Sequence, residues 1–166
     1  MPSHLAQMDL PYTAEQVFDL VADFESYPQF LPHVLHAHIL RRRDDTLFCE
    51  QVFRVGPMKF HFHTQTQLDR PRSIHVVCAD SPFGTFDDRW HFDARSNGGT
   101  HVTCRTVYHV KAGPLRVLVD KVLDEIFSST MHAFERRARR LYSAHAGAAH
   151  APGLTARSEK DSGSHG

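Results

Sequence analysis

The longest hydrophobic pattern in the chain runs from Pro114 to Tyr142 and has the period of an α-helix. Its apolar residues recur every three or four positions and form one broad stripe, whereas most charged residues fall on the opposite side. Proline is tolerated in the first turn of a helix because its missing N–H has no partner there. We therefore predict one amphipathic helix over 114–142, about 40 Å long. Such a helix needs a wide apolar surface to cover.

Between His33 and Val110 the pattern changes to alternating apolar and polar residues, which is the period of half-buried strands. In the clearest strand, over 58–68, the phenylalanines share one face and the histidines share the other. Short connections between successive strands favour antiparallel pairing, so we predict a meander of about six strands. Turn-forming residues separate these strands at 43–45, 56–57, 69–71, 80–82 and 96–99.

A strand and two short helices are expected before this meander. Residues 4–10 alternate weakly, as an edge strand does. Thr13 and Gln16 have the spacing of a capping box, in which each side chain binds a free backbone N–H of the other residue. A helix is therefore expected directly after Thr13. The aromatic segment 24–32 is bracketed by prolines and has room only for a short second helix, with Pro28 near its start.

These elements together predict an α+β helix-grip fold, a curved antiparallel sheet of about seven strands wrapped on the long C-terminal helix. The chain has 166 residues, 41% of them hydrophobic, which favours one domain with a substantial core. We assign this domain to residues 1–142. Residues 143–166 are rich in Ala, Gly, Ser and His without an apolar period and are predicted to form a disordered tail.

The charge balance gives little reason to expect a nucleic-acid-binding protein. Nineteen basic and nineteen acidic residues cancel, so no overall field attracts DNA or an anionic membrane. The local basic cluster at Arg41, Arg42 and Arg43 is interpreted first as a solvated face. The sequence shows neither a signal-peptide pattern nor an apolar run long enough to span a bilayer. We expect a cytoplasmic protein with at most peripheral contact to the inner membrane.

The three cysteines point to the same compartment. Cys49, Cys78 and Cys104 are odd in number, widely spaced and set in apolar segments. We interpret them as reduced thiols in the core of an intracellular protein.

Several segments resemble the coenzyme Q-binding START-like family, which includes the RatA-type proteins of bacteria. They are residues 12–23, the run Tyr-Pro-Gln-Phe-Leu-Pro at 27–32, and Ser-Pro-Phe at 81–83 followed by Trp-His-Phe at 90–92. The resemblance spans about residues 3–142, and similarity to polyketide cyclases is weaker. It implies an apolar tunnel between sheet and long helix. In quinone-binding members it also implies delivery of ubiquinone or its precursors to respiration and quinone biosynthesis.

A tunnel for an isoprenoid quinone should be mostly apolar, with a few polar groups that orient the head. Tyr27, Phe30 and Leu31 could form a lid at its mouth or touch the bilayer; alternatively, Phe30 and Leu31 pack under the sheet edge. The residues expected to line the tunnel, each of which could instead be ordinary core, are Gln51, Phe53, Phe60, Phe62, Phe86, Asp88, Trp90, Tyr108, Val119, Val122 and Ile126.

Polar residues on the covered face help to distinguish a cavity from a solid core, because each one left unpaired in a core is penalised by desolvation. Several together indicate a wet or ligand-bearing cavity. Gln51, Thr66 and Thr106 stand where the family tends to be apolar, which leaves open a precursor with a more polar head or another lipid. The inward polar residues are Gln51, Thr64, Thr66, Asp88, Thr106 and Tyr108.

Signals for catalysis or metal binding are few. The sequence contains no phosphate-binding glycine loop, no nucleophile elbow and no Cys-x-x-Cys pair. Two histidine pairs, at positions 36 and 38 and at 61 and 63, each share a strand face. We expect exposed strand residues and no native metal site, because no acid or cysteine at ligand spacing completes either pair. Asp88 beside Tyr108 is the one candidate for acid–base chemistry, and a buried hydrogen bond is the simpler interpretation.

Three functional hypotheses follow. The first is non-catalytic binding of ubiquinone or a related isoprenoid lipid, with no cofactor required. The second is an interaction protein of RatA type, which would bind the large ribosomal subunit through Arg41, Arg42 and Arg43 and block subunit association. The third is a cyclase- or aromatase-like enzyme that uses Asp88.

Overall fold

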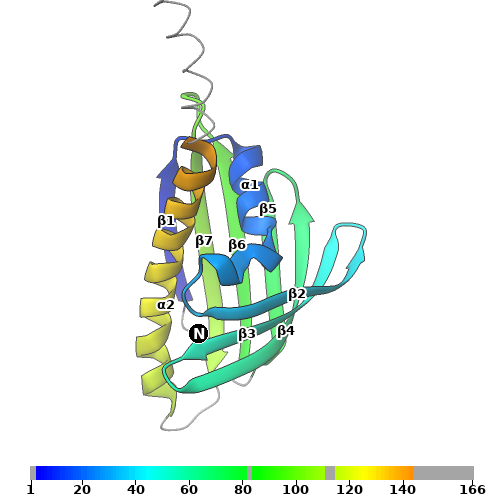
Figure 1. Cartoon of the computed structure of the whole chain (residues 1–166), viewed down its shortest axis with the longest axis vertical. Coiled ribbons are helices and arrows are strands. Elements are labelled where there is room, and N and C mark those ends of the chain that lie inside the picture. Colours follow the sequence, from blue (N-terminus) through cyan, green and yellow to red (C-terminus); the bar gives the residue numbers. More distant parts are fainter. Residues whose placement is uncertain (1–2, 82–83, 111–114, 144–166) are drawn as a thin grey trace, which may run out of the picture.

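A computed structural model describes residues 3–81, 84–110 and 115–143, except for the side chains of 79–81, 110 and 115–119. It contains a seven-stranded antiparallel sheet with strand order β1-β7-β6-β5-β4-β3-β2 (Figure 1). The predicted meander and helix-grip fold are confirmed. The strands are β1 (Ser3–Leu10), β2 (Val34–Arg43), β3 (Thr46–Val55), β4 (Met58–Asp69), β5 (Ser73–Ser81), β6 (Gly84–Ala94) and β7 (Thr100–Val110).

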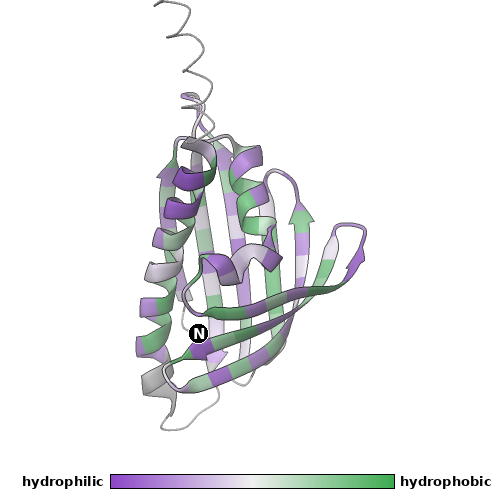
Figure 2. Ribbon diagram, viewed as in Figure 1, coloured by the Kyte–Doolittle hydropathy of each residue, from purple (hydrophilic) through white to green (hydrophobic). Residues whose placement is uncertain are grey.

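Apolar and polar residues alternate along the strands (Figure 2). Because successive strand residues point to opposite faces, this alternation separates an inner from an outer face. On β4, Phe62 and Thr64 are buried, whereas His61 and His63 between and beside them are exposed. Cys49, Cys78 and Cys104 are all buried and none of them forms a disulfide, as expected for core thiols. None of the described helices has both the length and the apolar character needed to cross a membrane.

The segment after β1 forms two consecutive helices, α1 (Ala14–Ala22) and the 3₁₀ helix η1 (Phe24–Gln29). The capping box is confirmed: Gln16 N donates to Thr13 Oγ1 over 3.2 Å, and Thr13 N donates to Gln16 Oε1 over 3.0 Å. Pro28 is the fifth of six residues in η1, so the prediction that it lies near the start is wrong. The helix begins earlier because Asp23 accepts bonds from both the backbone N–H and the hydroxyl of Ser26.

The predicted long helix is present as α2 (Leu115–Ala138), extended by a π-helical turn, η2 (Arg139–Ser143). Gly113 and Pro114 lie outside the described residues. In η2 the Tyr142 hydroxyl donates to Gln16 O over 2.8 Å, and the Ser143 hydroxyl is 2.8 Å from the Tyr12 hydroxyl. Ser143 therefore belongs to the folded domain, one residue beyond the predicted boundary. Residues 144–166 lie outside the described residues, and the predicted tail remains a prediction.

The hydrophobic core fills the end of the molecule where α1, η1 and the C-terminal half of α2 meet the sheet. Phe134 is 1% exposed, and its ring lies edge-on to Tyr27, Phe30 and Trp90 with centroid distances of 5.4–5.5 Å. Ala133 and Ala138 are equally buried. In the preceding turns of α2, only Ile126 is buried among residues 120–132. The C-terminal half of the helix therefore packs on the hydrophobic core, whereas the preceding turns lie over a less tightly packed part of the sheet.

Candidate functional site

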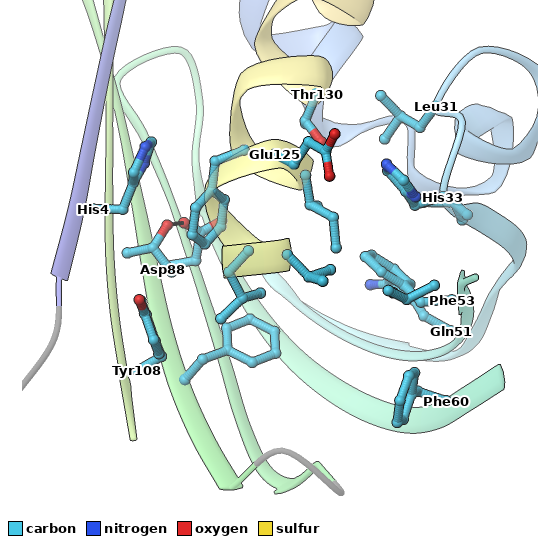
Figure 3. Close-up of a pocket in the computed structure, with 18 of the residues that line it drawn as sticks. His4, Leu31, His33, Gln51, Phe53, Phe60, Asp88, Tyr108, Glu125 and Thr130 are labelled. Carbon is cyan, nitrogen blue, oxygen red and sulfur yellow. Dashed lines mark hydrogen bonds between the residues drawn. The ribbon is translucent and has the colours of Figure 1, made fainter. Parts of the chain in front are cut away.

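A cavity of about 500 Å³ lies between the inner face of the sheet and the middle of α2 (Figure 3). This volume is within the range of about 300–1,000 Å³ that is usual for small-molecule sites. The cavity wall includes the tip of the β3–β4 hairpin, Val55 to Met58, and Met58 is 42% exposed. The cavity therefore reaches the surface beside this hairpin. Gly56 at the tip has φ +58°, a conformation that favours glycine and permits the tight turn.

Most residues predicted to line a tunnel do lie on the cavity wall, although their role in ligand binding stays a prediction. Val119 belongs to α2, but its side chain is outside the described residues. The ten that line the cavity are Gln51, Phe53, Phe60, Phe62, Phe86, Asp88, Trp90, Tyr108, Val122 and Ile126.

Sequence reasoning missed several parts of the wall. Leu123 and Thr130 continue the apolar stripe of α2, so the helical period could have identified them. Glu125 is a charged residue and carries no signal for an apolar wall, yet it lies at the exposed rim of the cavity (Figure 3). His4 and Ala6 carry no such signal, because β1 reaches the cavity only by pairing with β7, about a hundred residues later in the chain.

Asp88 is the centre of a hydrogen-bond network on the cavity wall. Its Oδ1 accepts bonds from Thr106 Oγ1 over 2.6 Å and from Cys104 Sγ over 3.2 Å, and its Oδ2 accepts from Trp90 Nε1 over 2.8 Å. Burial raises the pKa of this carboxyl above its usual range, and the three donors only partly oppose that effect. Asp88 therefore combines an ordered position with a tendency to retain its proton.

The expected pairing of Asp88 with Tyr108 is wrong. In the register between β6 and β7, Asp88 stands opposite Thr106, whereas Tyr108 stands opposite Phe86. Both residues line the cavity, but the Asp88 carboxylate accepts its hydrogen bonds from Thr106, Cys104 and Trp90. The buried hydrogen bond that we considered the simpler interpretation is present with different partners.

The segment proposed as a lid packs against the hydrophobic core. Tyr27 lines the cavity, is buried and donates its hydroxyl hydrogen to Val21 O. Burial raises the pKa of Tyr27 well above its usual range, with the Asp88 charge adding to the effect. Leu31 is buried on the same wall. Phe30 packs against Phe134 of α2, and the guanidinium carbon of Arg137 lies 5.1 Å from its ring centre. A role of this segment as a lid or in contact with the bilayer stays a prediction.

The inward polar residues divide into two groups. Gln51 lines the cavity and donates through Nε2 to Thr64 Oγ1 over a long 3.4 Å. Thr64 and Thr66 are buried and are not part of the cavity wall. Thr66 Oγ1 has no hydrogen-bond partner among the described residues. Beside them, burial raises the pKa of the Cys49 thiol to about 11. Only Gln51, Asp88, Thr106 and Tyr108 of the predicted polar set therefore face the cavity.

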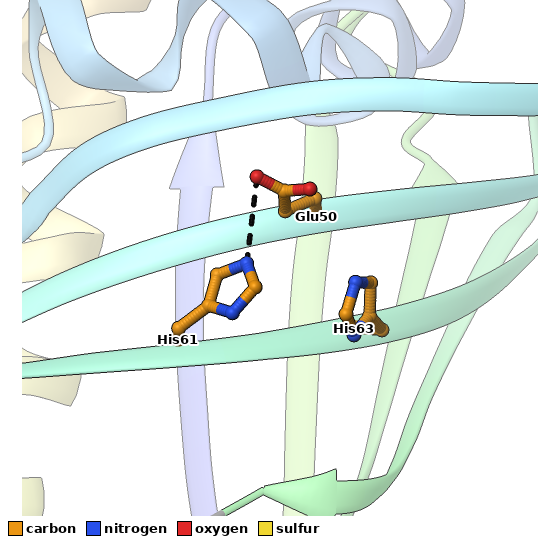
Figure 4. A group of neighbouring side chains, drawn as sticks. All are labelled: Glu50, His61 and His63. Carbon is orange, nitrogen blue, oxygen red and sulfur yellow. Dashed lines mark ion pairs between the residues drawn. The ribbon is translucent and has the colours of Figure 1, made fainter.

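On the opposite, outer face of the sheet, Glu50 of β3 lies beside His61 and His63 of β4 (Figure 4), and His36 of β2 approaches it from the other neighbouring strand. Its Oε1 is 3.4 Å from His61 Nε2 and 3.8 Å from His36 Nε2. Ligand atoms of Glu50, His61 and His63 all lie within 4.8 Å of one another. The expectation that no acid completes the histidine pair is wrong, because Glu50 is far from the pair in sequence and meets it through strand pairing.

The arginine cluster is exposed at the end of β2, beside the β2–β3 turn. The Arg41 guanidinium lies 4.4 Å from the centre of the Phe48 ring, an arrangement that orients its charge. Arg41, Arg42 and Arg43 are not part of the cavity wall. The cluster is therefore geometrically separate from the cavity.

Comparison with known proteins places these features in a family. Residues 10–135 match the family model described as polyketide cyclase / dehydrase and lipid transport. The Ribosome association toxin RatA of Escherichia coli K12 is 32% identical over 140 residues, which is 81% of this chain and 85% of that protein. The mitochondrial Coenzyme Q-binding protein COQ10 of Dictyostelium discoideum is 24% identical over 138 residues, which is 81% of this chain and 67% of that protein.

Solved structures agree on the fold. The Zhui aromatase/cyclase from Streptomyces superposes with a TM-score of 0.77 at 15% identity, and the match covers 84% of this chain and 94% of that one. The resemblance to a START-like family that includes RatA and coenzyme Q-binding proteins is confirmed. With its helix-grip fold and internal cavity, the chain belongs to the polyketide cyclase / dehydrase and lipid transport family.

Proposed function

We propose that the chain binds ubiquinone or a related isoprenoid lipid in the cavity, without catalysing a reaction on it. The observation that carries this proposal is the wall itself, which is aromatic and aliphatic apart from a few polar groups. A long apolar tail and a small polar head need a site of this composition. The relative whose name specifies coenzyme Q binding supports the choice of ligand.

Asp88 is the residue we assign to the head group. A quinone carbonyl is an acceptor and needs a donor, and a protonated carboxyl supplies one O–H. The raised pKa of Asp88 favours this protonated form, and Thr106 and Trp90 hold the side chain in position. The tail would then follow Phe62 and Phe60 toward the hairpin mouth.

Organic extraction and mass spectrometry of the protein purified from its own host test this proposal. Phe62→Trp and Val122→Trp fill the cavity, whereas Leu40→Trp adds the same group at an exposed position and serves as control. We expect about one quinone per chain in the wild type and in Leu40→Trp, and loss of the quinone in both cavity variants. A protein that is empty on purification and also fails to bind added short-chain ubiquinone would overturn the proposal.

Binding to the large ribosomal subunit, which would block subunit association, is the second candidate. It is supported by the exposed cluster of Arg41, Arg42 and Arg43 and by the name of the E. coli relative. Reversal of all three charges to Glu should abolish co-sedimentation with the subunit and leave quinone binding intact, because the cluster lies off the cavity wall. Unchanged co-sedimentation of this variant would exclude the arginine cluster as the contact.

A cyclase-like enzyme is the third candidate, supported by the fold of the aromatase/cyclase and by the position of Asp88. Asp88→Asn keeps the side-chain shape and removes the ionisable group. An enzyme that uses Asp88 loses turnover of a polyketide or quinone precursor in this variant, whereas a carrier shows altered affinity at most.

A further inference from the structure

The cluster on the outer face of β2, β3 and β4 has the composition of a metal site and is independent of the cavity. Imidazole and carboxylate are ligands suited to zinc and other divalent transition metals. We propose that Glu50, His61 and His63 bind a divalent transition-metal ion of the zinc class, with His36 as the nearest candidate for a fourth ligand.

The distances among the three side chains support this assignment. Two atoms bonded to zinc at about 2.0–2.2 Å in a tetrahedral site lie roughly 3.3–3.5 Å apart. Glu50 Oε1 and His61 Nε2 already stand at 3.4 Å. One ligand atom of His63 lies within 4.8 Å of ligand atoms of Glu50 and His61, and His63 is exposed, so its side chain has room to turn toward a bound ion.

Strand geometry holds the ligands without help from loops. His61 and His63 are two residues apart on β4 and therefore point to the same face. Glu50 stands directly opposite His63 in the antiparallel pairing of β3 and β4. A metal ion here joins the two strands across the sheet, and its site remains open to water or to a ligand from solution.

His36 offers a further donor from the third strand. Its Nε2 is 3.8 Å from the same Glu50 oxygen that His61 approaches, so β2 brings an imidazole to the other side of the carboxylate. The neighbouring His38 is engaged elsewhere, with Nδ1 3.0 Å from a carboxylate oxygen of Glu25. Of these two β2 histidines, His36 is therefore the one directed at the cluster.

Metal binding has a mechanical consequence for the cavity. The inner faces of β3 and β4 carry Phe53, Phe60 and Phe62, which line the cavity, and the hairpin that joins these strands borders its mouth. An ion that fixes Glu50 to the β4 histidines stiffens this hairpin from outside. Bound metal should therefore raise the thermal midpoint of the protein.

Titration of the full-length protein with zinc chloride by calorimetry, with visible spectroscopy of the cobalt(II) form, tests the proposal. The chain has fourteen histidines, so total metal uptake is not diagnostic and variants are required. Glu50→Gln and His63→Asn each remove one ligand at an accessible position. His91→Asn, at an exposed strand position on β6, is the matched control.

We expect one tight equivalent of zinc, a loss of at least about tenfold in affinity in Glu50→Gln and His63→Asn, and no change in His91→Asn. Zinc should raise the thermal midpoint of the wild type and the control more than that of the two ligand variants. The proposal is overturned if the wild type has no tight equivalent, or if the two ligand variants bind zinc as tightly as the control does.

Discussion

The division of α2 into a core-sealing half and a cavity-covering half can be tested by comparing two alanine substitutions. Phe134→Ala removes a ring that is 1% exposed and in edge-to-face contact with Tyr27, Phe30 and Trp90. Truncation of a core phenylalanine costs about 3–5 kcal/mol, and aromatic pairs add about 0.5–1.5 kcal/mol each beyond their buried area. We expect a loss near the upper end of that range, about 4–5 kcal/mol.

The matched control is Phe127→Ala, two turns earlier on the same helix. Phe127 borders the cavity as Phe134 does, but it is only half-buried and its described ring contacts are with His4 at 4.5 Å and Tyr108 at 6.4 Å, so its truncation removes less buried contact area. Full burial of a large apolar side chain stabilises a protein by about 1.5–3 kcal/mol, so truncation of the half-buried Phe127 should lower the free energy of unfolding by about 1 kcal/mol. Because a domain of this size is stable by only about 5–15 kcal/mol, the two variants should differ clearly in urea denaturation midpoints.

Equal losses in the two variants, or a loss below about 1 kcal/mol for Phe134→Ala, would mean that the C-terminal half of α2 does not anchor the core. A change in the dependence of free energy on urea concentration would instead indicate an altered unfolded or native state, so this slope must be measured as well.

Three further predictions concern the cap, the buried acid and the thiols. Thr13→Ala should lower the free energy of unfolding by about 1 kcal/mol in urea titrations, because it removes one side of the capping box; a change near zero would contradict a role for the cap. The pKa of the Asp88 carboxyl is raised in the folded state, so the folded protein binds the carboxyl proton more tightly than the unfolded chain does. The free energy of unfolding should therefore fall as pH rises above about 4, by about 1.4 kcal/mol for each unit by which the pKa is raised. Urea titrations at pH 4 and pH 7 should show this contribution in the wild type and its absence in Asp88→Asn; parallel pH profiles would refute it. Burial raises the pKa of the Cys104 thiol and raises that of the Cys49 thiol to about 11. The native protein should therefore react slowly with Ellman's reagent at pH 8, because the thiolate is the reactive form. Rapid labelling before denaturation would contradict this and show that the cavity exposes a thiol.

The periodicity of apolar residues was sufficient to predict the helices and strands and which face of a strand is buried. The alternation in β4 places Phe60 and Phe62 inside and His61 and His63 outside whatever their neighbours are, because successive strand residues point in opposite directions. The helical stripe and the capping box likewise depend on residues close in sequence. For this reason the parts of the cavity wall that lie on strand faces and on the apolar stripe of α2 were predictable once a cavity was assumed.

What the sequence determined by itself was therefore local: the elements, their order, their buried faces and the apolar character of the space between sheet and helix. The tertiary structure decided which residues meet across strands. The register of β6 with β7 places Asp88 opposite Thr106 and not opposite Tyr108. The register of β3 with β4 places Glu50 opposite His63. It also decided where the core is solid and where it is hollow, because Phe134 meets three rings at one end of α2, whereas the side chains at the other end do not fill the curve of the sheet. Local patterns fix the direction of a side chain, but partner distances depend on how the whole sheet twists and closes.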